Sequence, residues 1–465
     1  MKSLPQSKSI ASVFLCFACL GDPAARCQSP NSDSIATSGA SSADSAQRID
    51  ALQRQIDELQ SQLTALKKQL SESPNLSSTA ANPNPTSTPG GTAPSTAGQG
   101  ASPAAPAAPT LASLFGSTSI TGFVDGYFDY NFNHPHDYIS PTAQSPLTPL
   151  HLFNGPSSEF GLNMAEMIIA RPPDASASRL GYNFTLGFGT AMNVVNGSDP
   201  GGLGFAQYLK EAYLSYLAPV GKGLQVDFGK FVTPAGAEVI ETKDNWNYSR
   251  SLLFYYAIPY YHFGLRAKYA FSDKYSLSAY LVNGWNNVVD NNTGKTYGLS
   301  FGANPNKKLS FTENCFAGPE LTGTNAHWRQ LTDTVATYSP TSKLSLMANF
   351  DYGRGDEPTG LTHPVWWSGI AGYVRYAFND RYAFAGRYEY YNDHNGFTTG
   401  APGGQHLNEF TTTLERKVAG SLITRLEFRR DMSNRPTLLK GSTPTDAQNT
   451  LTGGLIYVFD VREPK

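Results

Sequence analysis

The chain has 465 residues, of which 40% are hydrophobic and only 15% charged, and its formal net charge at pH 7 is −2. This length allows one large β-barrel or two to three ordinary domains. The mean hydropathy of −0.33 excludes a helical membrane protein, the low charged fraction excludes a disordered chain, and the small net charge gives no reason to expect nucleic acid as a partner.

Residues 1–27 have the pattern of a signal peptide for export. Lys2 and Lys8 precede a short apolar run at residues 10–20. That run is too short to span a bilayer, and no later segment has the roughly 18 apolar residues of a membrane helix. After removal of the signal, Cys315 is the main remaining cysteine, so neither a disulfide framework nor a CxxC metal site is predicted.

Three segments without barrel character follow the signal. Residues 28–43 are Ser-rich and predicted to be disordered, and residues 44–70 are predicted to form a coiled coil. The heptad positions are Ile49, Leu52, Ile56, Leu59, Leu63, Leu66 and Leu70. About three heptads are marginal for an isolated coiled coil, so we expect it to form within an oligomer; the alternative is a lone amphipathic helix. Residues 71–111, rich in Pro, Ser and Ala, are predicted to be a flexible linker.

Residues 112–465 are predicted to form an all-β, 16-stranded antiparallel transmembrane β-barrel. From Ile120 to Asn133, apolar residues such as Val124 alternate with polar residues such as Asp125. Successive side chains of a strand point to opposite faces, so each such segment has an apolar face and a polar face. A soluble β-sandwich also alternates in this way, so the connections between strands carry the distinction.

The connections alternate between short and long. The candidate strands are residues 117–133, 158–171, 178–192, 205–218, 222–231, 260–271, 274–283, 294–303, 307–316, 328–338, 343–353, 366–378, 381–392, 406–419, 420–432 and 449–460. Short turns at one rim and long loops at the other are typical of outer-membrane barrels. An even number of strands places both ends of the barrel at the short-turn, periplasmic rim.

Three acidic residues interrupt this pattern. Glu166, Glu313 and Asp333 fall on the apolar parity of their predicted strands. A β-bulge, a register error or a position facing the lumen would each explain such a residue.

The third long loop, residues 232–259, is rich in charged groups that could shape a pore. The candidate constriction residues on this loop are Glu238, Glu241, Lys243, Asp244 and Arg250. The polar parity of the strands supplies the candidate wall residues Arg266, Lys268, Arg375, Arg387, Glu389, Arg425, Glu427 and Arg429. Acidic groups opposite arginines would create a transverse field that favours small polar solutes. The alternative is a solvated lumen surface on which these charges pair with one another.

No pattern for catalysis or cofactor binding stands out. The histidines have no Cys or Asp nearby at ligand spacing, so no metal site is predicted. His262 with Ser276 or Ser278 is the one arrangement that a barrel hydrolase could use, but no nucleophile motif accompanies it. We therefore predict neither an enzyme nor a cofactor.

Several multi-residue motifs resemble the OmpL-like family of β-barrel porins. They are EAYLSY at residues 211–216, DFGKFVTPAGAE at 227–238, NWNYSRS at 245–251, PYYHFG at 259–264, NGWNN at 283–287 and GPE at 318–320. The resemblance extends over most of residues 117–460. It implies a channel in the outer membrane of a Gram-negative-type envelope, a third loop that folds into the lumen, and a trimer, but it names no solute.

Together these patterns predict an outer-membrane porin with a periplasmic coiled coil. Small hydrophilic solutes would diffuse passively through a water-filled barrel narrowed by its third long loop. The partners expected are outer-membrane lipid, the solutes and further copies of the chain, with a trimer favoured. The alternative is a structural anchor that tethers the outer membrane to the cell wall, with peptidoglycan as the partner of the coiled coil.

Overall fold

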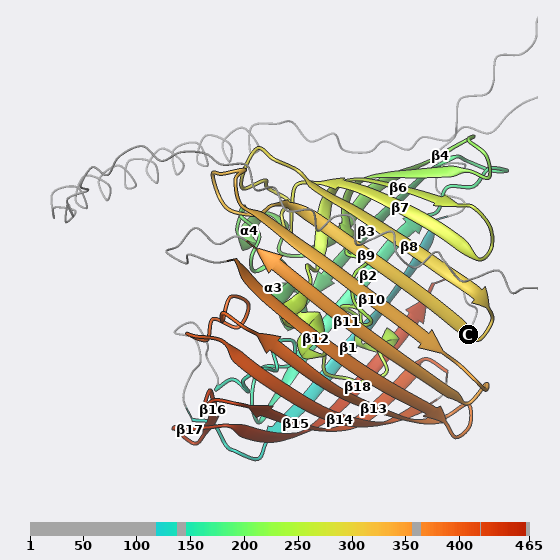
Figure 1. Ribbon diagram of the computed structural model, residues 1–465. Coiled ribbons are helices and arrows are strands. Elements are labelled where there is room, and N and C mark those ends of the chain that lie inside the picture. The colour runs from blue at the N-terminus through green and yellow to red at the C-terminus, as the bar shows by residue number, and fades with distance from the viewer. Residues whose placement is uncertain (1–117, 137–145, 356–363, 419, 462–465) are drawn as a thin grey trace, which may run out of the picture. The chain divides into compact units, whose positions relative to one another are not determined.

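The computed structural model describes residues 118–136, 146–355, 364–418 and 420–461. Within this part of the chain, sixteen antiparallel strands close into one barrel (Figure 1). Neighbouring strands follow one another along the chain, and the first and last strands pair to close the ring. The predicted all-β, 16-stranded barrel is therefore confirmed. The predicted signal peptide, Ser-rich segment, coiled coil and linker lie outside the described residues.

The barrel strands are β1 (Ser119–Asn131), β2 (Glu159–Arg171), β3 (Leu180–Phe188), β4 (Leu209–Ala218), β5 (Leu224–Val232), β6 (Tyr261–Ala270), β7 (Tyr275–Val282), β8 (Thr296–Asn306), β9 (Leu309–Pro319), β10 (Trp328–Tyr338), β11 (Leu344–Gly355), β12 (Val365–Ala377), β13 (Tyr382–Asp393), β14 (Gln405–Val418), β15 (Leu422–Ser433) and β18 (Ala447–Asp460). The connections contain the α-helices α3 (Thr190–Asn196) and α4 (Leu203–Ala206), the 3₁₀-helix η2 (Thr242–Asp244), the π-helix η3 (Leu253–Ala257), and a two-stranded sheet of β16 (Leu438–Lys440) and β17 (Thr443–Thr445). None of the described helices is long and apolar enough to cross a membrane.

Most predicted strand boundaries agree with these bounds within two residues. The short turn predicted at residues 304–306 is wrong, because β8 continues to Asn306 and residues 307–308 form the turn; the other larger differences lie in the long connections. The third predicted strand extends to residue 192, but β3 ends at Phe188 and α3 begins two residues later. Gly189 between them has a φ of 115°, which few other residues adopt, so the chain leaves the sheet there. Likewise residues 205–206 belong to α4 rather than to a strand, and residues 438–445, predicted as loop, include β16 and β17.

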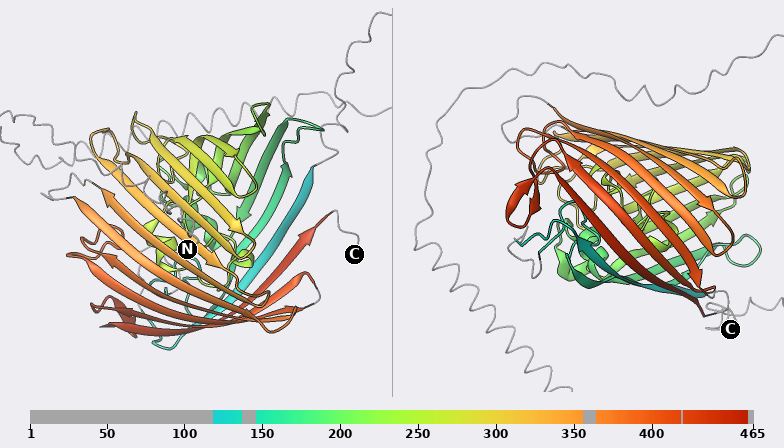
Figure 2. Two further views of the ribbon diagram at one scale, coloured as in Figure 1. Left: turned by 45° about the vertical axis from the view of Figure 1, so that its right-hand side comes forward. Right: turned by 90° about the horizontal axis from the view of Figure 1, so that it is seen from below.

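The two rims of the barrel differ in the way the alternation of connections predicts. Residues 307–308 suffice to join β8 to β9, whereas residues 233–260 join β5 to β6 at the opposite rim. Thr121 of β1 pairs with Asp460 of β18, so the barrel begins and ends at the short-turn rim. The further views in Figure 2 show the closed ring of tilted strands and the segments inside it.

The outside of the barrel is apolar and the inside is polar. Leu214, Leu426 and Leu455 point outward and are 53–67% exposed, whereas Asp129 and Glu409 point inward and are completely buried. Leu426 lies opposite Leu414 of β14 in the register, and Phe428 of the same strand lies opposite Leu451 of β18, so apolar side chains continue across adjacent strands. A continuous apolar exterior of this extent is unfavourable in water and fits the hydrocarbon core of a membrane.

Two of the three acidic residues that interrupt the alternation face the lumen, and the third faces outward. The register between β1 and β2 shifts at Asp125, so Asn163 is an extra residue in β2 and Glu166 beyond it faces inward. Asp333 also faces inward and is completely buried. Glu313, by contrast, stays on the outward parity, half-buried, and accepts a hydrogen bond from Thr334 at 2.7 Å.

Candidate functional site: the third loop inside the barrel

The connection between β5 and β6, residues 233–260, crosses the interior of the barrel. Near its start, Pro234 accepts a hydrogen bond from Asn314 of β9 at 3.1 Å. Further along, the hydroxyl of Tyr248 donates to Asp125 of β1 at 2.8 Å. Strands β1 and β9 are eight positions apart in a ring of sixteen, so they lie on opposite sides of the lumen. The third loop therefore contacts both sides of the barrel.

Three arginines of the wall donate hydrogen bonds to main-chain carbonyls of this loop. Arg425 of β15 donates to the carbonyls of Thr242 at 2.6 Å, Asn245 at 2.7 Å and Asn247 at 3.2 Å. The other two contacts are from Arg387 to Ser249 and from Arg429 to Arg250, each at 2.8 Å. Hydrogen bonds from a charged donor are stronger than neutral ones, so these contacts hold the loop against β13 and β15.

Two carboxylates of the same wall accept hydrogen bonds from loop amides. Glu427 of β15 accepts from the amides of Tyr248 at 2.5 Å and Ser249 at 2.9 Å. Glu389 of β13 accepts from the next pair of amides, those of Leu252 at 2.7 Å and Leu253 at 3.2 Å. Main-chain groups that would otherwise be buried without partners are satisfied in this way.

One carboxylate of the loop completes this network. Glu238 accepts from Arg387 and from the amide of Ser251, both at 2.6 Å, and Arg387 also donates to Glu409 at 2.8 Å. Arg387, Glu238 and Glu409 are at most 4% exposed. Breaking a buried, hydrogen-bonded pair leaves an uncompensated charge, which is strongly destabilising. We call the groups Glu238, Arg387, Glu389, Arg425, Glu427 and Arg429 the loop anchor.

The remaining predicted site residues lie outside the loop anchor. Arg250 is buried and donates to Asn163 at 3.1 Å, and Glu241 pairs with Lys210 of β4. The other contacts of these candidates are Lys243 with Asp244 at 2.5 Å, Arg266 with Asp227 at 2.8 Å, Lys268 with Asp227 at 3.5 Å, and Arg375 with Glu415 at 3.1 Å. Arg266 and Lys268 thus form their own group on β5 and β6, with no hydrogen bond to the loop among the described contacts.

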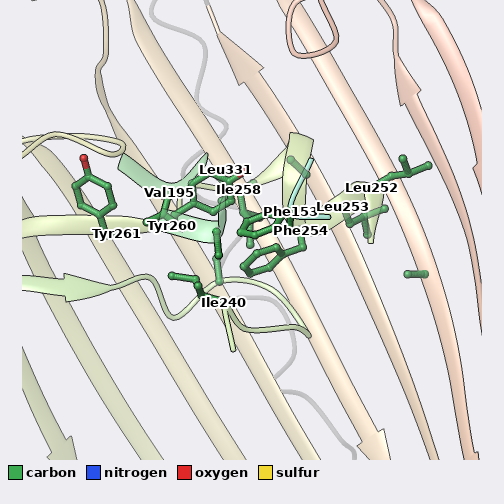
Figure 3. Packing of buried hydrophobic residues seen from close by; sticks show 14 of the residues in the cluster. Phe153, Val195, Ile240, Leu252, Leu253, Phe254, Ile258, Tyr260, Tyr261 and Leu331 are labelled. Atoms are coloured by element: carbon green, nitrogen blue, oxygen red, sulfur yellow. The ribbon is translucent and has the colours of Figure 1, made fainter. Parts of the chain in front are cut away.

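The sequence analysis missed a hydrophobic cluster within the lumen. Figure 3 shows apolar side chains of three long connections packed together inside the strands. They include Phe153 of the first connection, Val195 of the second, and Ile240, Leu252, Leu253, Phe254 and Ile258 of the third. The available signal was the apolar run at residues 252–258, which is unusual for a loop exposed to water.

A buried histidine was missed as well. His151 in the first long connection lies between Asp431 of β15, at 3.1 Å, and Asp129 of β1, at 3.9 Å. Its side chain and both carboxylates are completely buried. The first connection is thus fastened to the wall beside β1 by polar contacts, as the third is fastened to β13 and β15.

Comparison with known proteins places this barrel in a family. The family model described as "Putative beta-barrel porin-2, OmpL-like" matches residues 117–459. No curated protein sequence matches the chain. One similar solved structure is OmpT of Vibrio cholerae, folded in vitro, with 14% sequence identity and a TM-score of 0.47; the match covers 74% of this chain and 97% of that chain. A second is the outer membrane channel DcaP of Acinetobacter baumannii, with 11% identity and a TM-score of 0.47; the match covers 74% of this chain and 97% of that chain. A third is an anion-selective porin from Comamonas acidovorans, with 11% identity and a TM-score of 0.48; the match covers 74% of this chain and 99% of that chain.

Proposed function

The chain belongs to the OmpL-like β-barrel porin-2 family, and from this premise we propose that it is an outer-membrane porin through which small hydrophilic solutes diffuse passively. The observation that carries the proposal is the combination of an apolar exterior with a polar interior in a closed ring of sixteen strands. Such a barrel is stable only with lipid outside and polar groups or water inside. Diffusion through it needs neither an energy source nor a covalent step.

We further propose that the third loop narrows the water-filled path. The loop anchor is buried, so its charges hold the loop in place and do not line the path. Among the predicted site residues, the most accessible charges are those of Asp244, Lys268, Arg375 and Lys243, with side-chain exposures of 54%, 39%, 28% and 22%. Asp244 on the loop and the cations on the wall are the groups that would act on a passing ion.

Single-channel recording in planar bilayers tests the porin proposal. We expect the purified protein to give stepwise, open-channel currents, grouped in threes if the protein is a trimer. Ion selectivity would follow from reversal potentials, and Lys268→Glu should shift selectivity towards cations. Correctly folded protein, recognised by its heat-modifiable electrophoretic mobility, that never conducts would refute the porin proposal.

The coiled coil predicted for residues 44–70 carries the other proposals. We propose that it lies in the periplasm, where the short-turn rim would place it, and that it supports a homotrimer. The competing role is a structural anchor that binds peptidoglycan. Full-length protein that sediments with purified peptidoglycan, but loses this binding when residues 44–70 are deleted, would favour the anchor. Loss of the trimer alone in the same deletion would favour oligomerisation.

A further inference from the structure

A cavity of about 500 Å³ lies among the long connections. Its walls come from the second, third and fourth long connections, from the start of β10, from β12, and from the connection after β13. This volume is in the range of small-molecule sites, which typically combine apolar walls with a few placed polar groups. The cavity is separate from the loop anchor, because none of the anchor residues lines it.

Aromatic rings form much of the cavity wall. They are Tyr255, Tyr256, Tyr260, Trp285, Trp367 and Phe397. The rings of Trp285 and Trp367 are nearly perpendicular with centroids 6.1 Å apart, and Phe397 stacks on Trp367 at 5.6 Å. Trp367 is fixed by a hydrogen bond from its Nε1 to the carbonyl of Ala257 at 3.1 Å. These rings come from distant parts of the sequence and hold one another in position, so the cavity is preformed.

Polar groups lie among these rings. The guanidinium of Arg329 is 5.2 Å from the ring centre of Trp285 and 4.9 Å from that of Phe397, a cation–π arrangement that orients it. Asn286 and Thr398 also line the cavity. The buried Nε1 of Trp285 has no hydrogen-bond partner among the described residues. That atom has almost no accessible surface, so Trp285 offers a ligand its ring and not its N–H.

The charge of Arg329 is balanced close by. Glu320, at the end of β9, accepts hydrogen bonds from the amide of Trp285 at 2.8 Å and from Thr296 at 2.5 Å. Its carboxylate interacts electrostatically with Arg329. The cavity therefore presents donors and flat apolar surfaces without a large excess of positive charge. A multiply charged anion would find a single arginine that already faces a carboxylate.

The chemistry of the walls selects among ligand classes. A cation would lie beside the guanidinium of Arg329, and no carboxylate among the lining residues would pair with it. A purely apolar solute would cover the polar side chains of Asn286, Thr398 and Arg329 without offering them hydrogen bonds, which costs free energy. A sugar ring has apolar C–H faces that pack on aromatic rings, and hydroxyls at its edge that can pair with an arginine, an amide and a threonine hydroxyl. We propose that this aromatic cavity is a binding site for a short, neutral saccharide on its way into the channel.

This inference rests on the proposed porin function for its role, but its test separates the two. Full-length protein is titrated with maltose, and tryptophan fluorescence and single-channel current are recorded. We expect a saturable fluorescence change and brief interruptions of the current by maltose. Saturable binding by a protein that never conducts would refute the porin proposal and keep the site. Conduction without saturable maltose binding would keep the porin proposal and overturn the site.

Variants locate the binding to the cavity. Trp285→Ala should weaken maltose binding at least tenfold, and Trp285→Phe, which keeps an aromatic ring at this position, should weaken it less. Trp328 is the matched control, because it lies one residue before Arg329 but is 43% exposed on the outside of the barrel. Trp328→Phe should leave the affinity within twofold. Equal effects of Trp285→Ala and Trp328→Phe would overturn the assignment.

A second pair of variants tests the arginine. Arg329→Gln should weaken maltose binding several-fold. Arg416 is its control, because it makes a similar cation–π contact, 5.7 Å from the ring centre of Tyr382, but does not line the cavity. Benzoate, a flat aromatic anion without hydroxyls, is the competing probe. Benzoate that displaces bound maltose and binds more tightly than maltose would show that the cavity selects aromatic acids. That result would overturn the saccharide assignment.

Discussion

Replacing Arg425 by Met should free one end of the third loop while leaving the barrel intact. Arg425 makes three hydrogen bonds to the loop carbonyls of Thr242, Asn245 and Asn247. Its other partner, Glu415, keeps its contact with Arg375 at 3.1 Å, so the substitution leaves no carboxylate without a cation. The variant therefore removes contacts to the loop with little secondary damage.

The size of the effect follows from these three contacts. A hydrogen bond to a charged group contributes about 1.5 kcal/mol or more, so the loss of three is about 4.5 kcal/mol or more. At 1.36 kcal/mol per tenfold change, the ratio of docked to undocked loop falls by about a thousandfold or more around residues 242–247. Residues 248–253 should stay docked, because Glu427 and Glu389 still hold their amides.

Trypsin distinguishes the two ends of the loop. In the variant we expect rapid cleavage after Lys243, no faster cleavage after Arg250, and noisier or larger single-channel currents. Arg430→Met is the matched control, since Arg430 lies on the same strand but is exposed on the outside and donates to Asn449 at 3.0 Å. Equal protease resistance of the two variants would refute the anchoring role of Arg425, as would equal cleavage after Lys243 and Arg250.

Other positions give independent tests. Burial raises the pKa of Glu320 to about 7. Protonated Glu320 therefore contributes its full share of the folding stability below pH about 4.5, and about 3 kcal/mol of that stability is lost as the pH rises through 7. Glu320→Gln should flatten this part of the pH dependence of the melting temperature. A Cβ on Gly353 would lie 1.9 Å from the ring of Trp367, so Gly353→Ala should cost about 1–3 kcal/mol, whereas Gly372→Ala, with open space at its Cβ, should leave urea unfolding unchanged. Leu426→Arg on the apolar exterior should cost about 2 kcal/mol or more in refolding into lipid vesicles, and no cost would argue against lipid contact there.

The strands and their order were predictable from the sequence. A strand in a barrel wall has different surroundings on its two faces, so its side chains alternate with a period of two, and that period is visible without any knowledge of the fold. The lengths of the connections then separate the two rims. The bulge at Asn163 was not placed, because an extra residue changes the parity of Glu166 without leaving a sign of its own in the sequence.

The role of each inward-facing residue was decided only by the tertiary structure. Parity indicates that Arg425 and Lys268 both face the lumen, but Arg425 is buried against the third loop and Lys268 remains 39% exposed. The difference arises because Thr242, far from Arg425 in the sequence, folds back onto the same part of the wall. Local periodicity records which face of a strand a side chain occupies. Whether that face meets water or another segment depends on how long connections pack across the barrel, which only the closed fold determines.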